Sequence, residues 1–335
     1  MDVLLTGAFG NVGKFTLQEL LKKGCRVRVF ELKTPANEKI YKKFEKDIEI
    51  IWGDITNKKD VERAVANQDT VIHLAFVIPS LTEKRPNWTW EINVEGTRNL
   101  LNAMRALPVK PRIIFASSVS VFGKTNHLKP PRKISDPVMP TDNYSHHKVA
   151  CEQLIKISGL DWTILRLGAV LGVSLCDMDP LLFSVPPDTR IELIHAHDAG
   201  IAFANSVTKE NIRCRTLLIG GGKSCQMCQG DFVSRILEFI GIGMLPEQAF
   251  STEPFYLDWM DTSESQKLLD YQHRRLEDFL NDIRKHLGFK RKLIRIFRPF
   301  IRYWLLNKSP YLRKANHAGS SVKVRLKGNI ASGMN

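Results

Sequence analysis

The sequence lacks any long apolar run. No stretch approaches the roughly 18 uninterrupted apolar residues that a membrane-spanning helix needs. The first residues, MDVLLTG, place no basic segment before their apolar run and no small-residue cleavage site after it, so they are not typical of a secretory signal. These absences predict a cytoplasmic protein, with peripheral membrane contact left open by the C-terminal tail described below.

Cysteine is also scarce, with six residues in a chain of 335. Their scattered positions do not resemble a disulfide framework, which favours reduced thiols. Cys225 and Cys228 form a C-x-x-C pair, but no second pair or nearby histidine cluster completes a four-ligand zinc site. The sequence therefore predicts no metal.

The body of the chain carries little net charge. The formal net charge is +14, but residues 289–335 contain twelve Lys or Arg and no acidic residue, so the remainder carries +2. Apolar residues make up 43% and charged residues 25%, which is ordinary for a globular protein. The basic character therefore belongs to the tail.

Residues 1–171 alternate short β-branched runs with helical patterns. This alternation is typical of βαβ units and predicts an α/β fold with a Rossmann-type, doubly wound parallel sheet. Helical spacing covers residues 12–23, 59–67, 91–106 and 144–158. The expected strands are Val3–Thr6, Arg26–Phe30, Ile48–Trp52, Thr70–Leu74, Arg112–Ala116 and Trp162–Leu167.

The pattern loosens after residue 171. We expect residues 1–171, with a returning segment at about 191–220, to form the Rossmann-type domain. Residues 172–190 and 221–288 are expected to form a small substrate-binding lobe. Residues 289–335 form the basic amphipathic tail.

A glycine-rich loop lies between the first strand and the first helix. Gly7, Gly10 and Gly13 are spaced three apart in the segment TGAFGNVG. Glycine permits a tight turn and lets backbone N–H groups approach a pyrophosphate, while the following helix N-terminus favours its negative charge. The loop therefore predicts a dinucleotide site.

Two acids follow the second and third strands. Glu31 ends the second strand, where a carboxylate accepts hydrogen bonds from a ribose 2′-hydroxyl, and this favours NAD. Lys33 lies two residues further on and suits a 2′-phosphate, so NADP stays possible. Asp54 follows the third strand, at the place expected for an adenine amine.

Tyr144 and Lys148 are spaced four apart at the start of a helix, which puts both on one face. A phenol with a pKa of about 10 is a poor base at neutral pH, but a neighbouring cation stabilises its phenolate. Ser118 ends a buried strand at the same edge of the sheet and is placed to hydrogen-bond a substrate oxygen. Together the three predict a proton-handling site.

With these motifs, the chain resembles the extended short-chain dehydrogenases/reductases of the NAD-dependent epimerase/dehydratase group. The likeness runs over roughly residues 1–287 and includes His73-Leu74-Ala75, Asn93-Val94-Glu95-Gly96-Thr97 and Tyr256-Leu257-Asp258. It implies that Tyr144 is the acid/base, that Lys148 lowers its pKa and holds the nicotinamide ribose, and that Ser118 orients the reacting oxygen. The expected cofactor-binding residues are Gly7, Phe9, Gly10, Asn11, Val12, Gly13, Glu31, Asp54, Ile55, Leu74, Ala75, Asn93, Tyr144 and Lys148.

The chain departs from the family pattern at two places that concern substrate. Dehydratases of the group carry an Asp-Glu pair after the catalytic hydroxyl, where this chain has Val119-Ser120, so dehydration is disfavoured. Sugar-nucleotide epimerases usually have an Asn after the sixth strand, where this chain has Ala169. A sugar-nucleotide substrate is therefore left open, beside carbonyl reduction and secondary-alcohol oxidation.

Six further side chains need an interpretation. His146 and His147 are expected to face solvent at the start of their helix. His195 and His197 lack a third ligand and are expected to be structural. Trp88 and Trp90 are expected either to line the pocket or to pack.

Residues 290–305, projected as one helix, separate an arginine stripe from an apolar stripe with Trp and Phe. This pattern is typical of an interfacial helix on anionic lipid, and Pro299 is expected to kink it. Docking on the protein or on another subunit is the alternative, and segregated faces argue against nucleic acid.

The sequence predicts an NAD(P)-dependent oxidoreductase or epimerase acting on a secondary alcohol or carbonyl by hydride transfer. The alternatives are an inactive NAD(P)H-sensing protein and a tail-driven membrane scaffold. The expected partners are a small-molecule substrate and, by family resemblance, a second copy of the chain.

Overall fold

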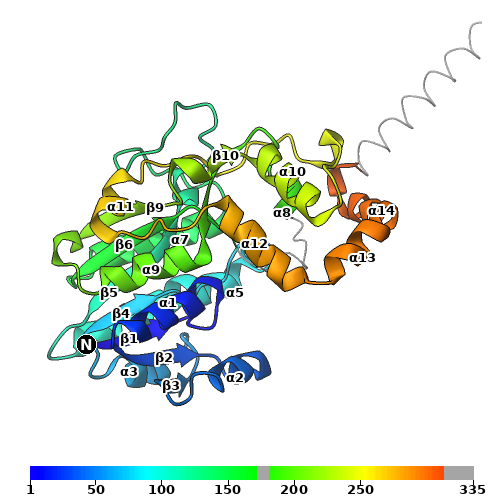
Figure 1. Ribbon diagram of the computed structural model, residues 1–335. Coiled ribbons are helices and arrows are strands. Elements are labelled where there is room, and N and C mark those ends of the chain that lie inside the picture. Colours follow the sequence, from blue (N-terminus) through cyan, green and yellow to red (C-terminus); the bar gives the residue numbers. More distant parts are fainter. Residues whose placement is uncertain (172–180, 313–335) are drawn as a thin grey trace, which may run out of the picture. The chain divides into compact units, whose positions relative to one another are not determined.

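The computed structural model describes residues 1–171 and 181–312 (Figure 1). The chain divides into two compact units, each described here by itself. The first comprises Met1–Gly172, Ile191–Gln226 and Tyr256–Leu276, and the second comprises Val173–Arg190, Met227–Phe255 and Glu277–Asn335. The predicted lobe thus differs from the second unit at Tyr256–Leu276, which groups with the sheet-containing unit.

The first unit is built on a seven-stranded parallel sheet in the order β3-β2-β1-β4-β5-β6-β9. The order reverses between β1 and β4, which is the switch point where doubly wound sheets bind ligands. The predicted Rossmann-type fold is therefore confirmed. The strands are β1 (Asp2–Thr6), β2 (Arg26–Glu31), β3 (Ile48–Trp52), β4 (Thr70–His73), β5 (Arg112–Ser118), β6 (Trp162–Leu167) and β9 (Arg215–Ile219).

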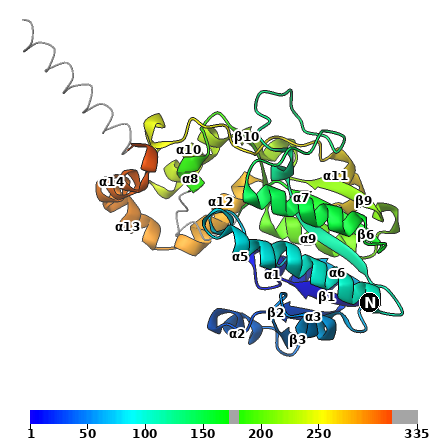
Figure 2. The ribbon, with the colours of Figure 1, turned by 180° about the vertical axis from the view of Figure 1, so that it is seen from behind.

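Helices cover both faces of this sheet (Figures 1 and 2). On one face α1 (Asn11–Lys22) packs against α9 (Ala196–Ser206), and on the other α3 (Lys58–Val65) and α7 (Asn143–Lys156) flank α6 (Gly96–Ala106). Because both faces are covered, the central strands β1, β4, β5 and β6 are buried along most of their length, and clusters of buried apolar side chains form the core. The remaining helices of this unit are α2 (Pro35–Tyr41), α4 (Leu81–Lys84), α5 (Pro86–Trp90) and α11 (Ser263–Leu269).

Several predicted elements differ in detail from the structure. The helix expected over 91–106 begins as a π-helix at Glu91–Glu95 before continuing as α6. Helix α11 ends at Asp270, which has a φ of 44°, and α12 (Leu276–Leu287) follows it. A three-stranded sheet has the order β10-β8-β7, formed by β7 (Ala169–Leu171), β8 (Arg190–His195) and β10 (Gln226–Cys228).

The second unit is largely helical in the part that the structure describes. Its helices are α8 (Leu181–Ser184), α10 (Gln229–Ile240), α12, α13 (Lys290–Ile296) and α14 (Arg298–Lys308). The kinked helix expected over 290–305 is thus two helices, with Pro299 in the first turn of α14, where its missing N–H costs no hydrogen bond. Part of the predicted lobe at 172–180 and the tail at 313–335 lie outside the described residues.

Within the described residues, no helix combines the length and the apolar character needed to cross a membrane. Short 3-10 helices complete the connections, at Val119–Phe122, Glu210–Ile212, Lys223–Cys225 and Glu247–Ala249.

Candidate active site

The loop between β1 and α1 has no room for side chains at two of its glycines. Gly7 has φ +71°, and a Cβ there would lie 2.6 Å from the backbone nitrogen of Ala75. A Cβ on Gly13 would lie 2.1 Å from the carbonyl oxygen of Gly7. The turn is therefore tight, and it aims the N-terminal end of α1 at the switch point, as an anion site requires.

Replacing Gly13 by Ala is expected to lower the free energy of unfolding by about 1–3 kcal/mol, because the new methyl group meets rigid backbone. Urea denaturation measures the change. The matched control is Gly10→Ala, whose Cβ would meet one atom at 3.2 Å. Equal losses in the two variants would contradict this account of the turn.

A cleft of 530 Å³ opens beside this loop. It holds eight of the predicted cofactor-binding residues, which come from the ends of β1 to β4 and the loops that follow. They are Gly7, Phe9, Gly10, Glu31, Asp54, Ile55, Leu74 and Ala75. Trp88 also lines the cleft. Of the two alternatives for this residue, lining the pocket or packing, the structure therefore supports the first.

Glu31 lines the cleft, and its carboxylate already accepts one hydrogen bond from the backbone. Oε1 accepts a hydrogen bond from the backbone N–H of Phe9 at 2.9 Å, and burial raises the pKa of the carboxyl despite this bond. Lys33 does not line the cleft, and its Nζ lies 3.7 Å from Glu38 Oε1. The cleft therefore offers an acceptor, and no cation from Lys33, at the end of β2.

Apart from Tyr144 and Lys148, four predicted cofactor-binding residues do not line the cleft, and they contact the segments around it instead. Asn11 donates to the Leu171 carbonyl at 3.4 Å, and Val12 packs against the core. Gly13 lets α1 approach the loop. The buried Asn93 accepts from the N–H of Val77 at 2.7 Å and donates to its carbonyl at 3.0 Å, so it fixes the segment after β4.

The predicted acid/base residues are brought together at the end of β5. Ser118 ends this strand, and Tyr144 stands in the first turn of α7, which begins with a capping box between Asp142 and Ser145. The Ser118 hydroxyl acts on the Tyr144 phenol and tends to lower its pKa. The two hydroxyls can therefore address one substrate oxygen.

Lys148 does not contact the Tyr144 hydroxyl in this structure. Its Nζ donates to the Ala116 carbonyl at 2.6 Å and lies 5.6 Å from the centroid of the Tyr144 ring. Burial raises the pKa of Tyr144 to about 12, although the Ser118 hydroxyl acts the other way. The lowered phenol pKa implied by the resemblance stays a prediction, because in this structure the effect of burial outweighs that of the neighbouring groups.

Burial lowers the pKa of Lys148 from 10.5 to about 7. Between pH 7 and 10 the unfolded chain therefore binds a proton that the folded chain does not, so stability rises with pH in this window. Tyr144 stays protonated in both states below pH 10. Relative to Lys148→Met, we expect the wild-type free energy of unfolding to increase by up to about 1.4 kcal/mol per pH unit. Guanidinium titrations at pH 7 to 9.5 test this. If the free energies of unfolding of the wild type and Lys148→Met changed equally with pH, the prediction would be refuted.

Phe76 connects the cleft to the acid/base residues and was not predicted. Its ring lines the cleft, lies 3.4 Å from Lys148 Nζ and meets the Tyr144 ring edge-on with centroids 5.8 Å apart. The cleft therefore ends at the tyrosine and lysine. The only sequence signal was its position directly after His73-Leu74-Ala75.

A buried ion pair, also missed, ties α7 to the sheet. Glu152, one turn beyond Lys148, accepts from Arg166 Nε at 2.9 Å and from Arg166 Nη2 at 2.7 Å. The hydroxyl of Ser117 donates to the same carboxylate at 2.6 Å. This network joins the helix of Tyr144 to the strand of Ser118, so it is placed to fix their separation.

The histidines next to Tyr144 differ in their surroundings. His146 is exposed, as expected, but the expectation of solvent for His147 was wrong. His147 is buried, lies 3.2 Å from Asn93 through Nδ1 and packs edge-on against Trp90 with centroids 5.2 Å apart. Asn93 and Trp90 cover it because both project from the preceding helical segment toward α7.

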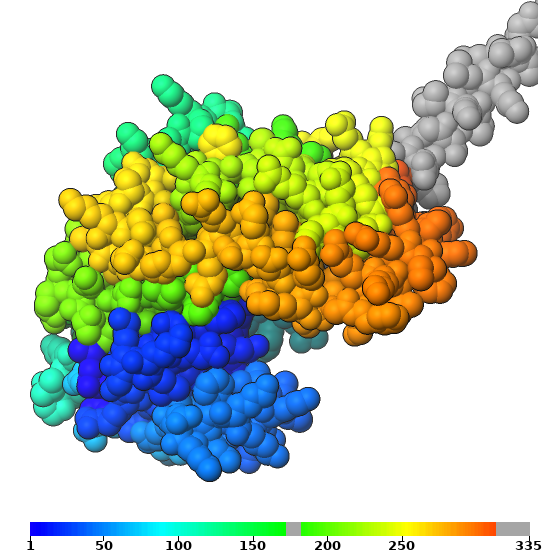
Figure 3. Space-filling view, viewed as in Figure 1, coloured from blue at the N-terminus to red at the C-terminus, as the bar shows by residue number. Residues whose placement is uncertain are grey.

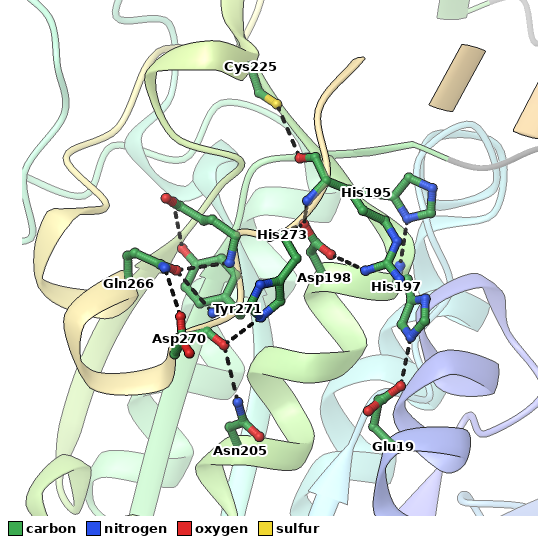
Figure 4. Close-up of polar contacts among 12 residues, drawn as sticks. Glu19, His195, His197, Asp198, Asn205, Cys225, Gln266, Asp270, Tyr271 and His273 are labelled. Carbon is green, nitrogen blue, oxygen red and sulfur yellow. Dashed lines mark hydrogen bonds and ion pairs between the residues drawn. The ribbon is translucent and has the colours of Figure 1, made fainter. Parts of the chain in front are cut away.

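His195 and His197 make structural contacts (Figure 4). His197 Nε2 lies 2.7 Å from Glu19 Oε1, and its ring stacks on Phe15 with centroids 4.9 Å apart. His195 Nδ1 accepts from the N–H of His197 and so caps α9. In the residues that the structure describes, no group of three His, Cys, Asp or Glu side chains is placed to hold a metal ion.

Comparison with known proteins places this site in a family. Residues 3–182 match the model of the NAD dependent epimerase/dehydratase family. The chain belongs to this family. The predicted cofactor, NAD, is the one that the family description names and that solved relatives contain.

Curated relatives cover only part of this protein. A 3-beta-hydroxysteroid dehydrogenase of Mycolicibacterium neoaurum is 32% identical over 158 residues, which are 46% of this chain and 42% of that protein. A UDP-glucose 4-epimerase of Halalkalibacterium halodurans is 31% identical over 173 residues, half of each chain. The matches therefore span about half the length of these relatives.

Solved structures share the fold over most of the chain. The UDP-glucuronic acid 4-epimerase of Bacillus cereus, in complex with UDP-glucuronic acid and NAD, has a TM-score of 0.72 and 24% identity, covering 86% of this chain and 100% of that one. The UDP-glucose 4-epimerase of Thermus thermophilus, in complex with NAD, has a TM-score of 0.71 and 21% identity, covering 86% and 99%. At such identities the likeness establishes the fold alone.

Proposed function

We propose that this protein is an NAD-dependent oxidoreductase or epimerase that acts on a secondary alcohol or the corresponding ketone. The observation that carries the proposal is the placement of Ser118 at the end of β5 and Tyr144 in the first turn of α7, beside the buried Lys148 and at the end of a cleft lined by the glycine loop. An inactive nucleotide sensor has no use for such a group of hydroxyls. The two classes of reaction share one step, because epimerisation is oxidation followed by reduction at the same carbon.

The cleft residues suit NAD. The turn at Gly7 and the close approach at Gly13 leave backbone N–H groups at the N-terminus of α1 free of side-chain obstruction, as a pyrophosphate needs. Glu31 is placed to accept hydrogen bonds from a ribose diol, whereas a 2′-phosphate would meet its carboxylate. These features support NAD over NADP.

Tyr144 and Ser118 handle the proton in this proposal. Bound NAD supplies the hydride acceptor, and NADH the donor. In the reductive direction Tyr144, protonated at neutral pH because its pKa is about 12, donates its proton to the carbonyl oxygen of the substrate. Ser118 donates a hydrogen bond to the same oxygen. In the oxidative direction the phenolate must form, and the ammonium of Lys148 is the nearby cation that would stabilise it.

The substrate class follows from a panel of compounds. Purified protein is incubated with NAD⁺ or NADH and with UDP-glucose, UDP-glucuronic acid, a 3β-hydroxysteroid and simple secondary alcohols and ketones. Absorbance at 340 nm reports net oxidation or reduction, and chromatography of the sugar nucleotides reports epimerisation. Turnover of one member supports the proposal, whereas tight NAD binding with no turnover of any would favour the sensor.

The oligomeric state stays a prediction. Family resemblance favours a dimer through the segments around residues 91–106 and 144–158, and sedimentation velocity of the full chain measures it.

A further inference from the structure

The second unit exposes a concentrated apolar surface on α13 and α14, drawn in orange in Figure 3. Seven large apolar side chains project from a stretch of sixteen residues, and each is at least 42% exposed. We call them the apolar face of α13 and α14: Phe289, Leu293, Ile296, Phe297, Phe300, Tyr303 and Trp304. A contiguous exposed patch of this kind on a soluble protein marks an interaction surface.

Three arginines of the same helices point away from the apolar face and donate hydrogen bonds to backbone carbonyls. Arg291 Nε donates to the Phe239 carbonyl at 2.8 Å, and Arg298 Nε donates to the Ile242 carbonyl at 3.0 Å. Arg302 donates to the Gly243 carbonyl at 3.0 Å. These carbonyls belong to the C-terminal end of α10 and the loop that follows it, where the helix dipole favours cations.

This docking orients the apolar face. With the arginine side held against α10, the opposite side carries Phe300 at 75% and Ile296 at 70% exposure. Docking on the protein, one of the alternatives left by the sequence, therefore applies to the arginine side of the helices. The arginine face packs on the protein, and the apolar face is turned outward.

Cations border the apolar face. Lys290, Lys292 and Lys308 are exposed, and Lys308 Nζ lies 3.8 Å from the centroid of the Trp304 ring. The sequence has no acidic residue after Asp282. Aromatic side chains beside lysines, in a segment whose sequence has no acidic residue, form the composition that binds the interface of an anionic bilayer.

Charge also favours an anionic bilayer over the two other candidates for this face, a second copy of the chain and a nucleic acid. A second copy docking through the same face would bring together two segments that each carry twelve Lys or Arg and no acid between residues 289 and 335. A nucleic acid is held mainly by cations that neutralise its phosphates, but Arg291, Arg298 and Arg302 donate to backbone carbonyls, and the side left exposed carries large apolar side chains.

We propose that the apolar face of α13 and α14 docks on an anionic membrane surface, with the two helices lying in the plane of the interface and the lysines contacting lipid headgroups. The proposal is independent of the reaction that the first unit catalyses. It assigns the protein a peripheral attachment through its second unit.

The test is cosedimentation of the full-length protein with vesicles of phosphatidylcholine alone or with added phosphatidylglycerol. We expect binding to the mixed vesicles only, weakened as salt is raised. The variant Phe300→Ser/Trp304→Ser is expected to lose at least tenfold in partitioning. Lys290→Gln/Lys292→Gln/Lys308→Gln is expected to lose the preference for anionic lipid.

Matched controls are Val109→Ser and Ile157→Ser, which remove apolar side chains that are 82% and 80% exposed in the first unit. They should bind vesicles like wild type, and thermal unfolding verifies that every variant is folded. If the wild-type protein bound neither kind of vesicle, the proposal would be overturned. Unchanged binding of the Phe300→Ser/Trp304→Ser variant would also overturn it. So would a dimer seen by sedimentation that this variant dissolves, since it would identify a second copy as the occupant.

Discussion

Replacing Tyr144 by Phe is expected to lower turnover on the order of 10²–10⁴-fold while leaving the affinity for NAD unchanged. The substitution removes the phenol hydroxyl but keeps the ring that meets Phe76 edge-on. The hydride step then lacks its proton donor, whereas the cleft that holds the nucleotide is untouched. Steady-state kinetics with the substrate found in the panel give the first quantity, and NADH fluorescence titration gives the second.

The control is Tyr41→Phe, which removes the hydroxyl of a different tyrosine, one that packs edge-on against Trp52. It should retain wild-type turnover. Full activity in Tyr144→Phe would assign the proton to a different group and remove the basis of the proposed mechanism.

Replacing Arg166 by Met is expected to lower the free energy of unfolding by about 3–5 kcal/mol. Arg166 and Glu152 are each less than 5% exposed in their side chains, so the substitution leaves a buried carboxylate with Ser117 and Lys156 as its remaining partners. Arg166 holds the pKa of Glu152 below its usual value against the effect of burial. Without Arg166, burial is expected to raise that pKa, so part of the loss should be recovered as the pH is lowered.

Urea denaturation at pH 7.5 and pH 5 measures both effects. Arg98→Met is the matched control, because Arg98 pairs with Glu95 on an exposed surface where an ion pair contributes about 0–1 kcal/mol. If both variants lost the same small amount, the buried pair would not be holding α7 to the sheet.

The parts of the fold that the sequence predicted are those fixed by local pattern. The first six strands followed from β-branched runs between helical segments, and the tight turn at Gly7 and Gly13 followed from glycines placed directly after a strand. In each case a short stretch of sequence carries the physical reason. The residues that line the cleft follow from the same rule, because the carboxyl ends of parallel strands meet at one edge.

The features that the sequence did not predict depend on contacts between distant segments. The burial of His147 comes from Asn93, 54 residues earlier, and the partner of Arg166 lies on a different element. The raised pKa of Tyr144 likewise depends on how completely the fold buries the phenol. Spacing of four placed Tyr144 and Lys148 on one face, but it carried no information about the Ala116 carbonyl that holds the ammonium.

The tail shows the same division. Helical projection separated the arginine and apolar stripes correctly, but it gave no means of deciding which stripe faces the protein. The carbonyls at the end of α10 decide it, because they accept hydrogen bonds from three of the arginines.

The central claim, that the cleft beside the glycine loop binds NAD, is tested most directly by calorimetric titration with NAD⁺, NADH, NADP⁺ and NADPH, on wild type and on Glu31→Ala. We predict saturable binding of NAD⁺ and NADH, weaker binding of the phosphorylated forms, and a loss of roughly 10–100-fold in NAD affinity for Glu31→Ala. Glu38→Ala, which removes only the exposed partner of Lys33, should bind like wild type. Wild-type protein that binds none of the four nucleotides would contradict the account.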